Sequence, residues 1–258
     1  MIIDTHAHTN DEKLIPFKEE ILAYLNENMS AYNEVGCNFE SSMAAIKLAE
    51  ENKKVWAVIG THPQDALTLT DEQLKEYERL SKHPKVVAIG EIGLDYYYED
   101  PVRDIQKEIF RKQLEMATRT DLPVVLHIRD AYKDAYDILN EYYTRLKGGI
   151  LMHCYSGSKE MVREFSKFDC YFALGGATTF KNAKKEDVIK AIPKDRLLLE
   201  TDCPYMTPVP FRGKPNKPEY VRFVAEKIAD TLETNIENVI NQTTENAKRL
   251  FFKMKIYD

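Results

Sequence analysis

The segment Asp4-Thr5-His6-Ala7-His8 distinguishes between the two α/β folds with which the rest of this chain is compatible, a closed barrel and an open doubly wound sheet. It follows an apolar run at the N-terminus, where an open doubly wound sheet would carry a glycine-rich turn for a dinucleotide. Two histidines stand there instead. Because side chains two apart on a strand point to the same side, both imidazoles can face one metal ion. The segment gives no support to dinucleotide binding and leaves a closed barrel as the favoured fold.

Eight short apolar or β-branched runs recur along the chain, at 1–5, 32–36, 55–60, 86–91, 123–128, 150–154, 171–174 and 197–200. Stretches between them, such as 41–50 and 102–120, have apolar residues at helical spacing. Asp71 and Ser158 are suited to cap helix starts. Strands alternating with helices pair in parallel. We therefore predict an α/β fold, a (β/α)8 TIM barrel spanning residues 1–258 as one domain, with two helices in 218–255 closing it.

Composition narrows the class of protein. With 43% hydrophobic and 30% charged residues among 258, the chain can bury a sizeable core. No apolar run reaches about 18 residues and the start lacks a signal peptide pattern, so no membrane span and a cytoplasmic location are expected. The four cysteines lie far apart, which argues against a disulfide framework. A net charge of −6 argues against a broad basic surface, so a phosphate-bearing substrate would need bound cations.

Potential metal ligands end five of the eight runs, where the active site of a barrel gathers. They are His6, His8, Glu91, His127, His153 and Asp202. Each alone could be a satisfied core histidine or a surface carboxylate. Together they predict a metal site, because buried charge is costly unless it is paired or metal-bound. One catalytic ion takes about three protein ligands, so two divalent ions are expected. Nitrogen and oxygen ligands fit zinc, manganese or magnesium.

Other residues are expected to contact substrate, namely His62, Arg129, Arg212 and Lys214. His62 ends the third run and is a candidate substrate ligand or proton donor, the alternative being a structural histidine. Arg129 follows His127 by two and should face the same way, as a phosphate clamp. For the three basic residues the alternative is solvated surface charge. The run Tyr96-Tyr97-Tyr98 could stack on bases of a single strand or pack at the edge of the site.

Six motifs in order resemble those of the TatD family of metal-dependent deoxyribonucleases. They are Asp4-Thr5-His6-Ala7-His8, Gly60-Thr61-His62-Pro63, Gly90-Glu91-Ile92-Gly93-Leu94-Asp95-Tyr96, His127-Ile128-Arg129-Asp130-Ala131, His153-Cys154-Tyr155-Ser156-Gly157 and Glu200-Thr201-Asp202-Cys203-Pro204-Tyr205. The resemblance covers nearly the whole chain. It implies a barrel enzyme that hydrolyses DNA as an exonuclease, with Mg²⁺ as the first choice of metal and Mn²⁺ or Zn²⁺ as alternatives.

The resemblance also implies how the ligands divide. His6, His8 and Asp202 would hold one ion, His127 and His153 the other, and Glu91 would bridge them. The set is complete, and the stretch 212–218 resembles the family's R-G-K-x-N-x-P. One departure is Gln64, where the family often has a second histidine two positions after the one matched by His62.

The expected catalytic residues are Asp202, Glu91 and His62. Two ions about 3.5 to 4 Å apart can neutralise a phosphodiester, activate a water and stabilise the leaving oxygen. Asp202 would be both metal ligand and general base, accepting the proton of the attacking water.

Two other functions remain open at this point. A binuclear amidohydrolase or lactonase acting on a small ester or amide shares the same ligand pattern. Many such enzymes bridge their ions with a carbamylated lysine, and this chain offers Glu91 with no lysine beside it, which favours the nuclease. A non-catalytic barrel that binds a metal or a protein would be marked by a missing ligand, and none is missing. The oligomeric state is not indicated, and a monomer is compatible with the pattern.

Overall fold

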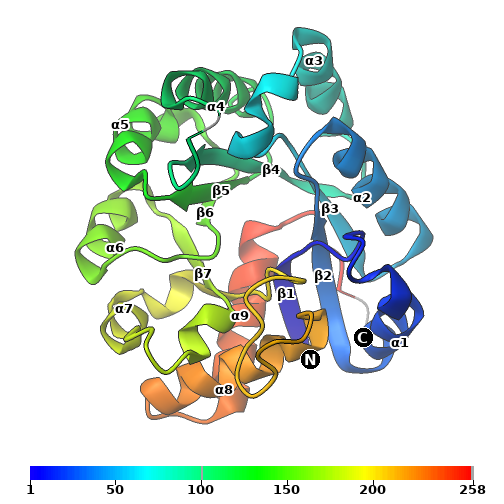
Figure 1. Ribbon diagram of the computed structural model, residues 1–258, viewed down its shortest axis with the longest axis vertical. Coiled ribbons are helices and arrows are strands. Elements are labelled where there is room, and N and C mark those ends of the chain that lie inside the picture. The colour runs from blue at the N-terminus through cyan, green and yellow to red at the C-terminus, as the bar shows by residue number, and fades with distance from the viewer. Residues whose placement is uncertain (100, 257–258) are drawn as a thin grey trace.

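A computed structural model describes residues 1–99 and 101–256 of the chain. Its eight strands pair in parallel and in chain order, as predicted. They are β1 (Ile2–Ala7), β2 (Met29–Val35), β3 (Val55–Ile59), β4 (Val86–Asp95), β5 (Val124–Arg129), β6 (Ile150–Met152), β7 (Tyr171–Leu174) and β8 (Leu197–Leu199). Figure 1 shows the strands as a ring enclosed by helices. β4 runs four residues beyond its predicted end at Glu91.

The ring is nearly closed between its first and last strands. Ala7 and Cys203 form a parallel bridge just past β8. The N–H of Asp202 donates to the carbonyl of His6, and the N–H of His8 donates to the carbonyl of Cys203, each over 2.9 Å. Closure therefore places Asp202 beside His6 and His8, although these residues come from opposite ends of the chain.

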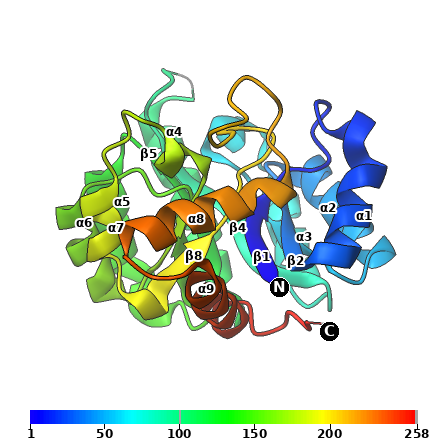
Figure 2. The same cartoon turned by 90° about the horizontal axis from the view of Figure 1, so that it is seen from below.

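Helices follow the strands. They are α1 (Lys18–Asn28), α2 (Phe39–Glu51), α3 (Asp71–Leu80), α4 (Arg103–Ala117), α5 (Tyr132–Tyr142), α6 (Lys159–Phe165), α7 (Glu186–Ala191), α8 (Val221–Thr231) and α9 (Ile236–Leu250). Helices α1 to α8 cover the outside of the ring (Figure 1), and α9 lies across one end (Figure 2). Short 3-10 turns lie at η1 (Ile15–Phe17), η2 (Pro63–Thr68), η3 (Tyr143–Arg145), η4 (Ser166–Phe168), η5 (Gly176–Thr179), η6 (Lys194–Arg196) and η7 (Pro218–Tyr220). Across the described part of the chain, the helices are too short or too polar to cross a membrane.

Local side chains set where the helices begin. Ser158 caps α6 as predicted, because its side chain accepts the N–H of Met161. The prediction for α3 was wrong by one residue, since Asp71 is already helical and Thr70 is the cap. Thr70 has an extended backbone, and it exchanges hydrogen bonds with Gln73 in a reciprocal capping box.

The apolar core has two layers, because alternate strand residues point into and out of the ring. Outward residues pack against the helices, whereas inward residues such as Val58, Val87 and Leu198 form a separate cluster with the end of α9. Phe251, just after α9, is fully buried in that cluster. Figure 2 shows α9 across one end of the barrel, opposite the loops that follow the strands. The inside of the ring is thus a filled core, and the end of α9 with Phe251 closes it at its base.

One glycine is required where β4 meets β5. Gly93 has a φ of +147°, which side-chain-bearing residues rarely adopt. A Cβ there would lie 2.1 Å from the carbonyl oxygen of His127. The absence of a side chain lets β4 pair with β5 directly beside two of the predicted ligands, Glu91 and His127.

Candidate metal centre

The six predicted metal ligands come together at the carboxyl ends of the strands. Five of them line a cavity of about 490 Å³, together with His62 and Arg129. His6 is fully buried and contacts the other ligands from outside that lining. β1, β4 and β5 supply His6, Glu91 and His127 from within the strands, while the remaining ligands follow strand ends.

Glu91 stands at the centre of the ligand set. Its Oε2 lies 3.4 Å from Nε2 of His6 and 3.8 Å from Nε2 of His8. Its Oε1 lies 2.7 Å from Nδ1 of His127 and 2.8 Å from Nε2 of His153. Each oxygen of this one carboxylate therefore faces a different pair of histidines.

Asp202 lies on the side of the first pair. Its Oδ1 is 3.5 Å from Nε2 of His8 and 4.0 Å from Nε2 of His6. The backbone of Asp202 is left-handed, with a φ of +55°. Such a conformation costs on the order of 1–3 kcal/mol for a residue other than glycine, and it persists here where the chain turns to bring the carboxylate back to β1.

Charge in the centre is arranged around ionised carboxylates. Burial alone would raise the pKa of Glu91, but the surrounding histidines, His153 first, hold it well below its usual value. Burial likewise opposes ionisation of Asp202, and the hydrogen bond from His8 together with nearby imidazoles lowers its pKa overall. Burial lowers the pKa of His6. The centre thus presents two anionic carboxylates and at least one neutral imidazole to a cation.

The donor chemistry fits divalent ions. In two overlapping triads, His6-His8-Glu91 and Glu91-His127-His153, each residue offers one donor atom, and the three donor atoms of a triad lie within 4.8 Å of one another. Nε2 of His6 and Nε2 of His8 are 3.1 Å apart, so at most one proton can stand between two ring nitrogens that face each other. Nitrogen and carboxylate oxygen donors converging in this way suit zinc, manganese or magnesium.

His62 borders the same cavity from the start of η2. Its Nδ1 accepts the N–H of Gln64 at 3.1 Å, and its Nε2 points toward Oε1 of Glu91 at 3.7 Å. Burial lowers the pKa of His62 to about 3. The ring is therefore neutral at pH 7 with its proton on Nε2, which makes it a hydrogen-bond donor toward the cavity. Gln64 also lines the cavity, and its buried Nε2 has no partner within residues 1–99 and 101–256.

Arg129 lies at the end of β5 and borders the cavity. Its guanidinium stacks over the ring of Tyr97, 3.6 Å from the centroid, with the ring of Tyr98 5.8 Å away. Both tyrosines are exposed, whereas the hydroxyl of Tyr96 donates to Asp134 on α5. Stacking of this kind is worth about 0.5–1 kcal/mol at an exposed site, and it restricts where the guanidinium can go.

Arg212 and Lys214 do not border the cavity. Both are exposed on the loop after β8. The guanidinium of Arg212 covers the ring of Phe180 at 3.9 Å and donates to the carbonyl of Thr207. Asn216, from the same motif, is buried and donates to the carbonyls of Thr201 and Tyr205 on either side of Asp202. In this conformation the motif shapes the loop beside Asp202.

Three residues near the ligands had no role in the sequence-based prediction. Oδ2 of Asp95 is 3.0 Å from Nε2 of His127. Oε1 of Glu200 is 3.4 Å from Nδ1 of His153, and Sγ of Cys37 is 3.8 Å from Nδ1 of His8. Asp95 could have been found, because it follows Glu91 by four and so lies on the same side of an extended strand.

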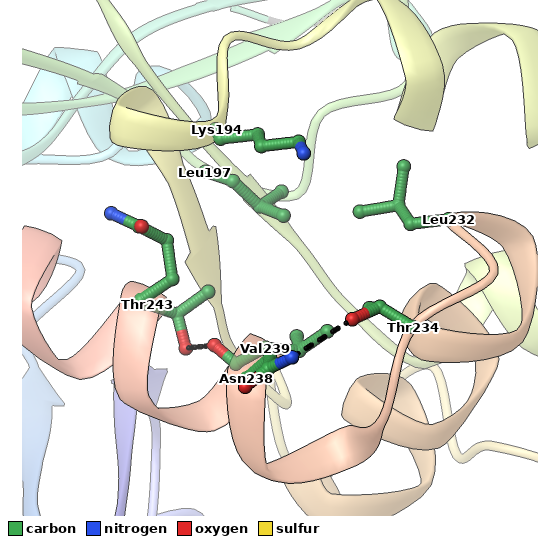
Figure 3. A pocket seen from close by; sticks show the side chains of 8 residues that line it. Lys194, Leu197, Leu232, Thr234, Asn238, Val239 and Thr243 are labelled. Carbon is green, nitrogen blue, oxygen red and sulfur yellow. Dashed lines mark hydrogen bonds between the residues drawn. The ribbon is translucent and has the colours of Figure 1, made fainter.

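A second cavity, of about 220 Å³, lies between β8 and the two C-terminal helices (Figure 3). Two pairs of its polar groups bond to one another: Nδ2 of Asn238 donates to Thr234, and Thr243 donates to the carbonyl of Val239. No histidine or carboxylate is among the described residues that line it. This cavity therefore lacks the groups that metal chemistry would need.

Nitrogen and oxygen donors that converge at the carboxyl ends of the strands of a TIM barrel are typical of metal-dependent hydrolases. A family profile described as TatD related DNase matches residues 3–252. The chain belongs to this TatD-related family, as its motifs had indicated.

Individual relatives agree with this membership. The chain is 48% identical over 253 residues to the uncharacterized metal-dependent hydrolase YabD of Bacillus subtilis, covering 97% of this chain and 99% of YabD. The crystal structure of YjjV, a TatD homologue from Escherichia coli K12, matches with a TM-score of 0.91 and 30% identity, covering 97% and 98% of the two chains. An uncharacterized amidohydrolase from Saccharomyces cerevisiae, 17% identical with a TM-score of 0.84 over 97% and 99%, shares the fold.

Proposed function

We propose that this protein hydrolyses DNA phosphodiester bonds as an exonuclease, with two divalent ions bound between His6, His8, Asp202, Glu91, His127 and His153. The observation that carries the proposal is the placement of Glu91, whose two oxygens each face a separate histidine pair. Glu91 is therefore placed where one carboxylate could help to hold an ion beside each histidine pair. Membership in a family described as TatD related DNase supports DNA as the substrate.

When bound, two such ions, with Mg²⁺ expected and Mn²⁺ or Zn²⁺ as alternatives, supply positive charge for phosphate oxygens and acidify the attacking water. Asp202 is the general base. Its lowered pKa keeps it ionised, and its side chain is 14% exposed, so it can reach a water in the cavity. Glu91 contributes to catalysis by fixing the two ligand pairs at one spacing.

The remaining residues bind the substrate. Arg129 can offer two parallel N–H donors to a phosphate, which a lysine could not. His62 donates through Nε2 to a phosphate or leaving oxygen, and Gln64 offers the free amide of its Nε2 close by. Arg212 and Lys214 would join them only if the loop after β8 moves toward the cavity.

The test is hydrolysis by metal-free protein given Mg²⁺, Mn²⁺ or Zn²⁺, on single-stranded DNA, duplex DNA, RNA and small esters and amides. We expect DNA cleavage that Asp202→Asn slows by roughly 10²–10⁴-fold, the usual contribution of a general base. Asp121→Asn is the control, because Asp121 is exposed and contacts only Lys147 among the ion pairs. Turnover of a small ester or amide without cleavage of any DNA would show instead that the substrate is small.

Circular single-stranded DNA tests the exonuclease part separately. An enzyme that needs an end should release mononucleotides from a linear strand and leave a circle of the same sequence intact. Equal cleavage of circle and linear strand would contradict an exonuclease while leaving DNA hydrolysis in place.

A further inference from the structure

Asp95 contacts the candidate ligand His127 at the edge of its ring that faces away from Glu91. It is buried at the end of β4, and its Oδ2 lies 3.0 Å from Nε2 of His127. The other ring nitrogen of His127, Nδ1, faces Glu91 at 2.7 Å and Nε2 of His153 at 3.3 Å. One edge of the imidazole therefore meets the centre and the opposite edge meets Asp95.

Asp95 is itself held in place by α4. Gln106, buried on that helix, accepts the N–H of Asp95 at 2.8 Å and donates to its carbonyl oxygen at 2.8 Å. Oδ1 of the carboxylate accepts the N–H of Tyr97 at 2.9 Å. Oδ2 is thereby left to His127. Backbone, carboxylate and helix are fixed relative to one another, which is what a support for a ligand needs.

Among the other candidate ligand histidines, His8 has an acceptor at the corresponding edge. Nδ1 of His8 lies 2.9 Å from the carbonyl of Val35, whereas Nδ1 of His153 lies 3.4 Å from Glu200 without a hydrogen bond between them. For Nδ1 of His6, the described residues offer no partner. An acceptor behind a metal-bound imidazole fixes which nitrogen carries the proton and how the ring is turned. Asp95 gives His127 the shortest carboxylate contact of this kind.

We propose that Asp95 is a positioning residue for His127: it accepts the Nε2–H hydrogen bond and so presents the Nδ1 lone pair to the metal centre. The inference rests on the metal centre of the proposed function and not on its substrate. Direct ligation by Asp95 is the competing explanation, because His62, Asp95 and His127 also have donor atoms within 4.8 Å of one another. His127 would then have to bind ions through both ring nitrogens and keep no proton, which is why we favour positioning.

Metal affinity separates the two explanations. Zinc binding is measured against a competing chelator in the wild type, Asp95→Ala, Asp95→Asn and Asp134→Ala. Positioning predicts that Asp95→Ala still takes up two ions, one of them with 10–100-fold weaker affinity, as is usual when such a partner is lost. Asp95→Asn should recover part of the loss, because its amide oxygen can accept the same hydrogen bond. Asp134 is the control, since it bonds to Tyr96 in the same loop but not to a ligand.

Nitrogen NMR of ¹⁵N-histidine-labelled, zinc-loaded protein gives a readout independent of turnover. Wild type should show His127, assigned with a His127→Gln variant, protonated on Nε2, and Asp95→Ala should shift or broaden that signal while the protein keeps its fold. If Asp95→Ala does not fold, Gln106→Ala should weaken the same ion less, since the carboxylate remains. Wild-type affinity and an unchanged His127 signal would overturn the proposal. A wild type with three ions, reduced to two by Asp95→Ala, would overturn it in favour of ligation. No bound zinc in the wild type would overturn the centre and this inference together, whereas normal binding without DNA cleavage would affect only the proposed substrate.

Discussion

His6 and His83 carry the same imidazole in opposite surroundings. His6 is fully buried, with its Nε2 3.1 Å from that of His8 and 3.4 Å from Glu91. His83 is partly exposed and lies beside Glu50 at 3.2 Å, away from the cavity. The contrast offers a matched pair of variants for the metal centre.

We expect His6→Ala to lower the affinity for one metal ion by more than about 100-fold, since loss of a residue that only hydrogen-bonds to a ligand already lowers the affinity by about 10–100-fold. His83→Ala should bind metal as the wild type does. Elemental analysis after dialysis, followed by chelator competition, measures both. Full metal content in His6→Ala would contradict the placement of His6 among the ligands.

Asp4 predicts a pH dependence of stability. It is fully buried, and this burial raises its pKa to about 8 from 3.8 despite hydrogen bonds from Thr201 and His6. The folded protein therefore binds this proton more tightly than the unfolded chain does. Its contribution to the free energy of unfolding should be complete below pH 3.8 and lost as the pH rises to about 8, with a slope of at most about 1.4 kcal/mol per pH unit.

Denaturant titrations of metal-free protein between pH 4 and 8 test this, with Asp4→Asn as the comparison. The amide cannot ionise, so the variant should lose the downward slope assigned to Asp4. Parallel pH profiles in the two proteins would show that Asp4 does not titrate in this range.

The convergence of the six candidate ligands could be predicted from the sequence because a strand of period two ends at an identifiable residue. A polar residue that directly follows an apolar run is therefore expected at the carboxyl end of a strand, the mouth of the barrel, where the active site lies. Asp95 was missed because the strand was expected to end at its first charged residue, Glu91. Ile92 and Leu94 instead continue the apolar pattern, and pairing with β5 continues the strand to Asp95. The direction of a long side chain such as Arg212 depends on what it can stack on, here Phe180, which is distant in sequence.

At the level of elements, the contact between β4 and β5 depends on Gly93. Gly93→Ala should lower the free energy of unfolding by at least about 1–3 kcal/mol, because its φ is unfavourable for alanine and its Cβ would clash with the carbonyl of His127. It should also weaken metal binding, since relief of the clash displaces His127.

Gly213→Ala separates the two effects. Gly213 also has a positive φ, +86°, but nothing lies within 4 Å of a Cβ placed there. Thermal and denaturant unfolding should show a cost from backbone conformation alone, with metal affinity unchanged. Equal losses in both variants would mean that the close approach of β4 and β5 is not what Gly93 serves.

Predictability also differs between elements. The eight strands could be located from short apolar or β-branched runs and turn signals, and a strand such as β3 is a continuous apolar run buried on both faces. The start of α3 was predicted one residue too late, because both Asp71 and the Thr70 before it are residue types that can cap a helix. In the folded chain Thr70 is the cap: its hydroxyl accepts the N–H of Gln73, and the side chain of Gln73 accepts the N–H of Thr70.

For the whole molecule, the base of the barrel is the place where stability can be tested apart from activity. Phe251 is fully buried against the inside of the ring, and its neighbour Phe252 is 54% exposed. Phe251→Ala should lower the free energy of unfolding by about 3–5 kcal/mol, the usual cost for a buried phenylalanine. Phe252→Ala should change it by less than about 0.5 kcal/mol.

Metal affinity and catalysis at low temperature should be nearly unchanged in both variants, because the mouth lies at the opposite end of the barrel (Figure 2). Calorimetric melting and a chelator titration on the same samples measure the two properties. A large loss of metal binding in Phe251→Ala, while the protein remains folded, would show that base and mouth are coupled.

Phe251 and the end of α9 close the base of the barrel, and this limits how a polymeric substrate could move. For the proposed exonuclease, the filled base means that a DNA strand cannot pass through the barrel. The released mononucleotide would have to leave by the opening through which the next strand end enters. We therefore expect accumulating mononucleotide to inhibit the proposed reaction by occupying the place that the next strand end requires.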